Sequence, residues 1–216
     1  MGKNKQIEKP HLILCEGADA TYFIIEYLKY LIKNGENEFG SFQAMNFGGN
    51  EELPRFLKAM PNLPNYGTLN SVTIVRDAES NYNGAVQSLS NLLQSLGFSV
   101  PLKSNEIKQL ANIKFAFSLF PSLSEHREDG TLEDLYIKNL VDLSCDLSNE
   151  IDSFLDRIQL QGRKIPRKHK SKLYTYFAVT DKFTSMKLAE AAGAGAFNFD
   201  CKELNSLKKL LKRICS

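Results

Sequence analysis

Residues 12–23 read LILCEGADATYF, a stretch in which four apolar residues end on a single carboxylate, Glu16, followed by Gly17. A short apolar run that stops at a Glu-Gly pair is typical of a strand buried in a parallel sheet. Residues 20–33 then carry apolar side chains at helical spacing and end at an Asn-Gly pair, which is a common helix end. The stretch therefore predicts a strand, a turn and a helix.

The same alternation continues beyond this unit. Residues 42–47, 71–75 and 114–120 are predicted strands, and residues 51–59 and 85–96 are predicted helices. Alternating strands and helices favour a mainly parallel sheet with helices on both faces. We therefore predict an α/β fold of the Rossmann-like type, in which functional groups gather at the carboxyl ends of the strands.

The pattern changes after Pro121 and becomes helical. Thr131 and Asp134 resemble a capping box with Asp in place of Glu. The predicted helices of this half are residues 131–141, 149–159, 173–179, 185–192 and 204–214. We treat residues 1–216 as a single domain, with an α/β core at 10–125 and a C-terminal helical extension at 126–216 that completes the site.

Composition places the chain among ordinary globular proteins. It has 216 residues, 43% hydrophobic and 24% charged, and a formal net charge of +2. This charge is too small for a nucleic-acid binder of the histone type, so any charge argument is local.

The cysteines and the chain start bear on location. Cys15, Cys145, Cys201 and Cys215 form no CxxC pair and have no histidine at metal-ligand spacing, which argues against structural zinc and for free thiols. The polar start is followed by no apolar signal region, and no stretch is long and apolar enough to cross a bilayer. We expect a cytoplasmic protein.

Acidic side chains follow two of the predicted strands. Glu16 and Asp19 follow the first strand, and Asp77 and Glu79 follow the strand at 71–75. Alternate residues of an extended chain point the same way, so these carboxylates are expected to converge at one edge. Clustered carboxylates repel one another, and a divalent cation such as Mg²⁺ removes that cost. The alternative is structural, since any one of these acids alone is more often a helix cap or a turn residue.

In combination the motifs resemble a known family. ILCEGADATYF resembles the glutamate-glycine motif of Toprim domains, and VTIVRDAES resembles their Asp-x-Asp motif, with Glu79 in the second acidic place. Toprim domains occur in topoisomerases, bacterial primases, RecR-type recombination mediators and OLD-family nucleases. The longer Glu79 side chain departs from the family pattern.

A third motif narrows the resemblance. EDGTLEDLYIKNL, which begins at Glu128, resembles the later leucine-glutamate motif of OLD-like Toprim nucleases, with Glu133 in the place of the motif acid and Asp134 beside it. The whole chain resembles the small standalone OLD-like Toprim proteins. This resemblance implies hydrolysis of DNA or RNA phosphodiester bonds with one or two Mg²⁺ or Mn²⁺ ions. The implied ligands are Glu16, Asp19, Asp77, Glu79, Glu133 and Asp134.

Basic residues form the last element of the predicted site. OLD-like nucleases use a lysine near the metals, and the candidates are Lys170, Lys172 and Lys182. We favour Lys172 because it lies at the start of the helix predicted at 173–179. The stretch 163–172 contains no acid and includes Arg163, Lys164, Arg167, Lys168, Lys170 and Lys172. It is either a track for a phosphate backbone or a solvated surface loop, and the sequence favours neither.

Two other functions stay open at this stage. The first is a non-catalytic binding or regulatory module that acts with a separately encoded ATPase, because we expect no ATPase domain before the acidic motifs and because Glu79 departs from the family pattern. The second is a phosphohydrolase or nucleotidyl transferase that acts on small molecules. The basic stretch argues for a polymeric substrate instead.

Overall fold

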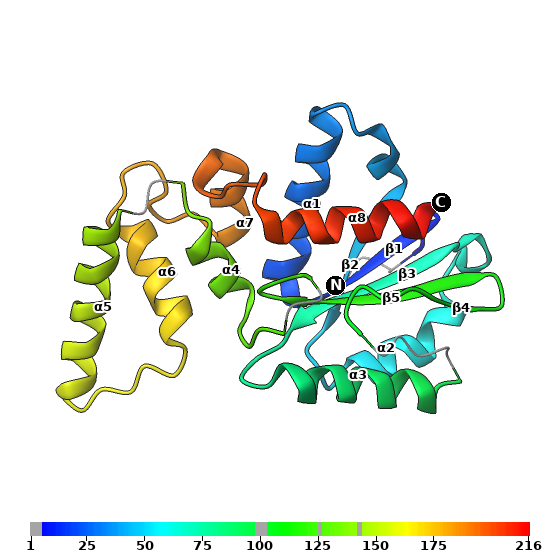
Figure 1. Cartoon of the computed structure of the whole chain (residues 1–216), viewed down its shortest axis with the longest axis horizontal. Helices are drawn as coiled ribbons and strands as arrows, with labels where there is room; N and C mark the ends of the chain where they lie inside the picture. Colours follow the sequence, from blue (N-terminus) through cyan, green and yellow to red (C-terminus); the bar gives the residue numbers. More distant parts are fainter. Residues whose placement is uncertain (1–5, 98–102, 125–126, 142–143) are drawn as a thin grey trace.

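The computed structural model describes residues 6–97, 103–124, 127–141 and 144–216 (Figure 1). Its sheet has five strands in the order β2-β1-β3-β5-β4. The strands are β1 (His11–Glu16), β2 (Phe42–Gly48), β3 (Ser71–Asp77), β4 (Lys108–Leu110) and β5 (Ile113–Phe120). All neighbouring strands run parallel except β4, which pairs with β5 in the antiparallel direction. The predicted α/β fold with a mainly parallel sheet is confirmed.

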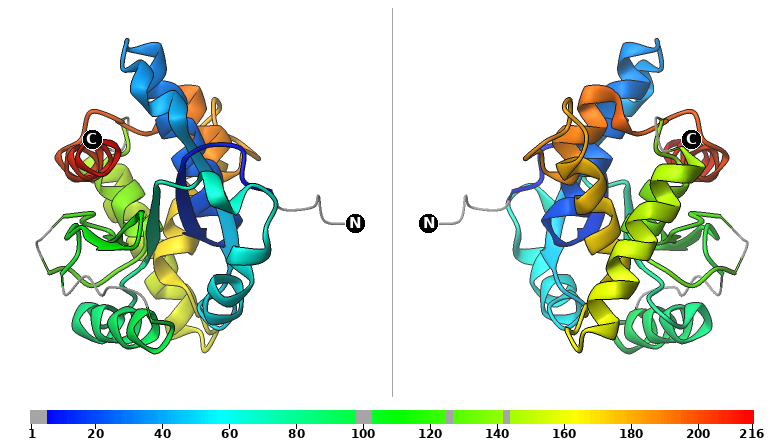
Figure 2. Two further views of the ribbon diagram at one scale, coloured as in Figure 1. Left: turned by 90° about the vertical axis from the view of Figure 1, so that its right-hand side faces the viewer. Right: turned by 90° about the vertical axis from the view of Figure 1, so that its left-hand side faces the viewer.

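Helices cover both faces of this sheet, as predicted. The helices α1 and α8 lie on one face, and α2 and α3 lie on the other (Figures 1 and 2). The bounds are α1 (Gly17–Lys33), α2 (Leu53–Ala59), α3 (Tyr82–Ser95), α4 (Leu132–Lys138), α5 (Cys145–Leu160), α6 (Lys168–Ala178), α7 (Leu188–Ala191) and α8 (Lys202–Cys215). Short 3-10 turns occupy Asn37–Ser41, Met60–Asn62 and Tyr66–Thr68, and a π turn occupies Ala192–Ala196.

The apolar run of β1 divides its side chains between two cores. Ile13 and Cys15 face the core under α1 and α8, whereas Leu12 and Leu14 face the core over α2 and α3. All four side chains are fully buried. A strand covered on both faces has no solvent side, which explains why its sequence is continuously apolar rather than alternating.

The C-terminal half is helical, as predicted, and its helices lie in two different places relative to the sheet. The amphipathic helix α8 packs against β5, and the Tyr27 hydroxyl on α1 donates to the Leu204 carbonyl at 3.0 Å. Helix α8 therefore covers part of the sheet, although the sequence places the core at residues 10–125. By contrast, α5 and α6 form an antiparallel hairpin that projects beyond the carboxyl ends of the strands (Figure 1).

Two local features differ from the sequence prediction. Strand β4 has only three residues, which is too short for an alternating pattern to reveal. The predicted helix at 185–192 shrinks to the four residues of α7, which run into the π turn and end at Gly195 with φ of 95°. A positive φ suits glycine and stops a right-handed helix.

The predicted free thiols and the absence of a membrane span can also be compared with the structure. All four cysteines are free, so the thiol prediction is confirmed. Within the described ranges, no helix combines the length and the apolar composition needed to cross a bilayer.

Candidate active site

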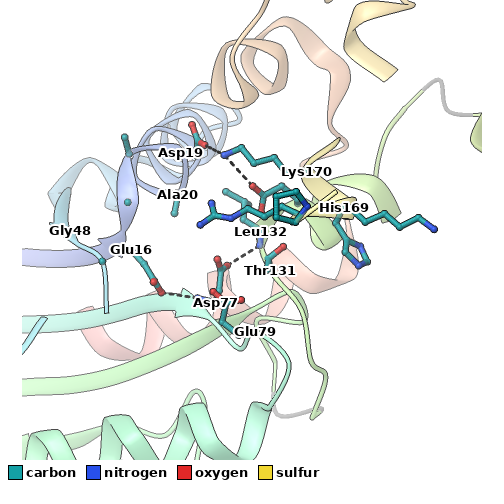
Figure 3. A pocket seen from close by; sticks show the side chains of 17 residues that line it. Glu16, Asp19, Ala20, Gly48, Asp77, Glu79, Thr131, Leu132, His169 and Lys170 are labelled. Carbon is teal, nitrogen blue, oxygen red and sulfur yellow. Dashed lines mark hydrogen bonds and ion pairs between the residues drawn. The ribbon is translucent and has the colours of Figure 1, made fainter. Parts of the chain in front are cut away.

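The three acidic motifs meet at one pocket of about 510 Å³ (Figure 3). Strands β1 and β3 are parallel neighbours, so their carboxyl ends lie at the same edge of the sheet and bring the first two motifs together. The N-terminus of α4 brings the third. The acidic residues that line this pocket are Glu16, Asp19, Asp77, Glu79 and Glu133.

A backbone pairing joins the second motif to the third. The Glu79 amide donates to the Gly130 carbonyl at 2.9 Å, and the Gly130 amide donates back to the Glu79 carbonyl at 2.6 Å. Gly130 has φ of 137°, and a Cβ atom there would lie 2.8 Å from an Asp134 carboxylate oxygen. Only glycine fits this position without displacing its neighbours. The pairing spans loops that are far apart in sequence, so no local pattern reveals it.

Asp77 is the most strongly perturbed acid of the pocket. Its Oδ1 accepts a hydrogen bond of 2.9 Å from the Leu132 amide at the start of α4. Burial is the main cause that raises the pKa of Asp77 to about 8, and the nearby Glu16, Glu133 and Glu79 add to it. Ionisation of Asp77 is therefore opposed in the described structure, and a bound cation would relieve this condition.

Glu16 does not act as the helix cap that the structural alternative proposes. Although it occupies the N-cap position of α1, its side chain makes no capping hydrogen bond. Its Oε2 instead lies 3.4 Å from the Asp77 amide, which donates to it, and 3.9 Å from Nε of Arg76. Burial raises the pKa of Glu16, and the Arg76 guanidinium partly opposes that shift. Gly17, with φ of 75°, turns the chain into α1 behind this carboxylate.

Asp134 has a structural role in this arrangement. One of its oxygens accepts from the Thr131 amide at 2.8 Å and from the Thr131 hydroxyl at 3.0 Å, so the predicted capping box is present. Its other oxygen lies 2.5 Å from Nδ1 of His169. Asp134 is not among the lining residues of the pocket, whereas its neighbour Glu133 is. Consecutive helical residues point about 100° apart, which separates the two roles.

Among the candidate lysines, the structure brings Lys170 to the pocket. Its Nζ lies 3.1 Å from Asp19 Oδ2 and 3.6 Å from Glu133 Oε1 (Figure 3). Lys172, favoured from sequence, instead lies 2.6 Å from Asp152 of α5. Helix α6 begins at Lys168 rather than at residue 173, so positions 170 and 172 are about 200° apart around its axis and face opposite sides.

Lys182 also lies outside the pocket lining. Its ammonium is 5.2 Å from the centre of the Phe183 ring and 3.7 Å from a Cβ atom built at Gly195. It therefore lies near the π turn at Ala192–Ala196. Lys182 would have to move away from this turn to reach the acidic residues.

The basic stretch 163–172 contains both residues that form ion pairs and residues that do not. Lys168 pairs with Asp156 at 2.5 Å, Lys170 pairs with pocket acids, and Lys172 pairs with Asp152. Arg163, Lys164 and Arg167 are exposed and form no side-chain hydrogen bond or ion pair among the described residues. The stretch itself contains no acid, but α5 supplies two of its partners, Asp152 and Asp156, at a spacing of one helical turn.

The donor set can be tested for its fit to a metal. The predicted ligands that line the pocket are carboxylates, which are the hard oxygen donors that Mg²⁺ and Mn²⁺ prefer. Within the part of the chain that the structure describes, however, no three acidic, histidine or cysteine side chains are grouped closely enough to hold a metal as they stand. The Leu132 amide and Lys170 already engage carboxylate oxygens there. The donor chemistry fits a divalent cation, and binding would need side-chain movement.

The raised pKa of Asp77 predicts a pH-dependent stability. In metal-free buffer the folded state keeps the Asp77 proton up to about pH 8, while the unfolded state loses it near its ordinary pKa of 3.8. Stability contributed by this group therefore falls as pH rises across that interval. We expect Asp77→Asn to be more stable than wild type, and the gap in free energy of unfolding to widen by on the order of 2 kcal/mol between acidic and mildly alkaline pH. Urea titrations of both proteins at acidic and at mildly alkaline pH measure this difference in free energy of unfolding. A difference that does not change with pH contradicts the prediction.

Comparisons with known proteins give the following similarities. The sequence profile of a family described as "Protein of unknown function (DUF3226)" matches residues 10–216. The C-terminal region of the Burkholderia pseudomallei OLD protein aligns with a TM-score of 0.45 and 13% identity, over 96% of this chain and 100% of that chain. The C-terminal region of the Xanthomonas campestris pv. campestris OLD protein aligns with a TM-score of 0.45 and 12% identity, over 96% of this chain and 94% of that chain. No curated protein matches.

Proposed function

We propose that this chain, which belongs to the family described as "Protein of unknown function (DUF3226)", is a metal-dependent nuclease that hydrolyses phosphodiester bonds of DNA or RNA. The observation that carries the proposal is the convergence of Glu16, Asp77, Glu79 and Glu133 on one pocket at the carboxyl ends of the strands. These residues come from three motifs in the order that the Toprim resemblance implies. The raised pKa of Asp77 supports a cation site, because the pocket holds more negative charge than its own cations balance.

Mg²⁺ or Mn²⁺ is the proposed cofactor, held by Glu16, Asp77, Glu79 and Glu133. When bound, such an ion supplies Lewis-acid activation and neutralises charge on a phosphodiester. Asp19 lies in the same pocket and is a weaker candidate, because Lys170 already pairs with it. Asp134 is the weakest, because the capping box and His169 occupy both of its oxygens.

The chain's own groups would orient the site. The Leu132 amide fixes Oδ1 of Asp77, and the Asp77 amide with Arg76 restrains Glu16. Holding acidic groups on strand ends and a helix terminus limits their movement, which preorganisation requires. Lys170 places a positive charge at the same pocket, where it can balance negative charge on a phosphate oxygen.

A cleavage assay tests the proposed function. Purified protein is incubated with single-stranded DNA, duplex DNA or RNA in Mg²⁺, in Mn²⁺ or in EDTA. We expect cleavage of at least one substrate with a divalent cation and none in EDTA. Folded protein that cleaves none of the three substrates with either metal would falsify the proposal.

Lys170 and Lys172 offer a matched pair for the role of the lysine. We expect Lys170→Ala to lower the cleavage rate by about 10- to 100-fold, because a cation that touches pocket acids is lost. Lys172→Ala removes the same charge from the opposite side of α6, where Asp152 is its partner, and is expected to cleave within about twofold of wild type. A larger loss of cleavage in Lys172→Ala than in Lys170→Ala would instead identify Lys172 as the catalytic lysine.

A second candidate function is a non-catalytic module that binds a partner such as a separately encoded ATPase. The observation that favours it is the pairing of Lys170 with Asp19 and Glu133, because these two acids are already compensated without a metal. Calorimetry separates the two functions. Binding of Mn²⁺ that disappears in Glu16→Gln supports the nuclease, whereas no metal binding together with co-purification of an ATPase supports the module.

A further inference from the structure

We propose that the tip of the α5–α6 hairpin, residues 161–167, contacts the phosphate backbone of the nucleic acid, and that Lys168 and Lys172 of α6 do not. This inference rests on the proposed function and names the part of the molecule that would hold the polymer. From sequence the whole stretch 163–172 is one candidate track. The structure separates its charges by what they touch.

The lysines of α6 are used within the protein. Lys168 and Lys172 pair with Asp156 and Asp152 of α5, and these pairs join the two helices of the hairpin. Lys170 pairs with Asp19 on α1 and so joins the hairpin to the pocket. Lys168 and Lys172 would gain little free energy from an approaching phosphate, because each would first have to give up its pair with α5.

The tip carries the charges that remain. Arg163, Lys164 and Arg167 are exposed and have no side-chain ion pair among the described residues. No acid lies between them along the chain. Three like charges on one short loop produce a local positive field, although the chain as a whole is nearly neutral. Two of the three are arginines, whose planar guanidinium groups bind phosphate in a bidentate manner.

The tip is also continuous with the acidic pocket. Pro166 and Arg167 of the tip line the pocket together with Lys168 and with the carboxylates of the strand ends. A strand whose phosphodiester lies at Asp77 would therefore occupy the pocket that Arg167 also lines. This adjacency distinguishes the tip from other exposed basic residues, such as Arg55 and Lys58 on α2, which do not line the pocket.

An exposed apolar side chain accompanies these charges. Leu160, the last residue of α5, is 88% exposed and directly precedes the tip. A leucine at the end of a basic loop offers an apolar contact to a base or a sugar, as apolar side chains do in many nucleic-acid interfaces. It adds a contribution that does not depend on counterion release.

Binding measured without metal tests the inference separately from cleavage. Fluorescence anisotropy of labelled single-stranded DNA, duplex DNA and RNA is recorded in EDTA, over a range of salt concentrations. The tip variant is Arg163→Ala, Lys164→Ala and Arg167→Ala combined. The control variant removes the same three charges elsewhere, through Arg55→Ala, Lys58→Ala and Lys209→Ala, which are exposed positions outside the pocket.

We expect the tip variant to bind at least about tenfold more weakly than wild type, and the slope of log K against log salt to fall by about 2. The control variant is expected to bind within about twofold of wild type. Leu160→Ala is expected to weaken binding without changing the salt slope. Thermal melting followed by circular dichroism establishes that each variant is folded.

The other possible results show whether this inference, the nuclease proposal or both are wrong. If the tip and control variants weaken binding equally, or if the tip variant binds like wild type, the inference is overturned and the nuclease proposal stands on its cleavage assay. If wild type binds through the tip but cleaves nothing with Mg²⁺ or Mn²⁺, the nuclease proposal fails and the tip remains a nucleic-acid surface. If wild type binds none of the three nucleic acids, both fail, and the tip is then available for an acidic protein partner.

Discussion

Asp77→Asn is expected to lower metal-dependent cleavage by about 10³-fold or more while the protein stays folded. The asparagine keeps an oxygen that can accept from the Leu132 amide, so the start of α4 is preserved. It removes the carboxyl group whose ionisation burial and three neighbouring acids oppose most. The substitution therefore removes a cation ligand and also the cost of ionising a buried acid, so activity and stability should move in opposite directions.

Single-turnover cleavage and calorimetric metal binding measure this effect. The matched control is Asp152→Asn, which removes a carboxylate from α5 that pairs with Lys172 away from the pocket. We expect the control to cleave and to bind metal as wild type does. An Asp77→Asn variant that retains cleavage within tenfold of wild type would exclude Asp77 from the proposed chemistry, whichever metal is used.

Phe23→Ala is expected to cost about 3 to 5 kcal/mol of the free energy of unfolding. Phe23 of α1 is fully buried, and its ring centre lies 6.4 Å from that of Phe120 on β5 and 6.2 Å from that of Tyr136 on α4. It also contacts Phe197 at 5.0 Å, beyond the π turn. One side chain thus joins the first helix, the sheet and two parts of the C-terminal half, and its removal leaves a cavity among all of them.

The same variant tests the proposal that residues 1–216 form one domain. If the sheet and the C-terminal helices share one core, urea unfolding of Phe23→Ala follows a single transition at lower denaturant, by fluorescence and by circular dichroism. Phe154→Ala on α5 is the control, because that ring is 43% exposed and its loss is expected to cost less than about 1 kcal/mol. Two separated transitions would instead assign the C-terminal helices to an independent unit.

Much of the fold is visible in local patterns of the sequence. The run LILC is continuously apolar because helices cover both faces of the sheet, and the stretch SVTIV at 71–75 is rich in β-branched residues; the structure contains both strands. Helix α8 follows from its spacing of leucines, and the capping box of α4 follows from Thr131 and Asp134. By contrast, β4 is three residues long and gives no periodic signal.

The candidate site is visible only in part. That Glu16 and Asp77 lie at one edge follows from parallel strands, since both residues end a strand. The choice between Lys170 and Lys172 depends on which side of α6 faces the pocket, and the packing of α6 against α4 and α5 sets that side. The partners of the basic stretch come from α5, at separations that no motif spans.

By itself, the sequence determined the strand-turn-helix at residues 12–23, the alternating order of the core and the residues that carry charge at the strand ends, because these features depend on neighbours along the chain. Only the tertiary structure decided which charges compensate one another. It paired Lys170 with Asp19, held Asp77 against the amide of Leu132 and left the tip of the α5–α6 hairpin without acidic partners among the described residues. Charge compensation depends on distance in space, and the folded chain sets that distance independently of separation in sequence.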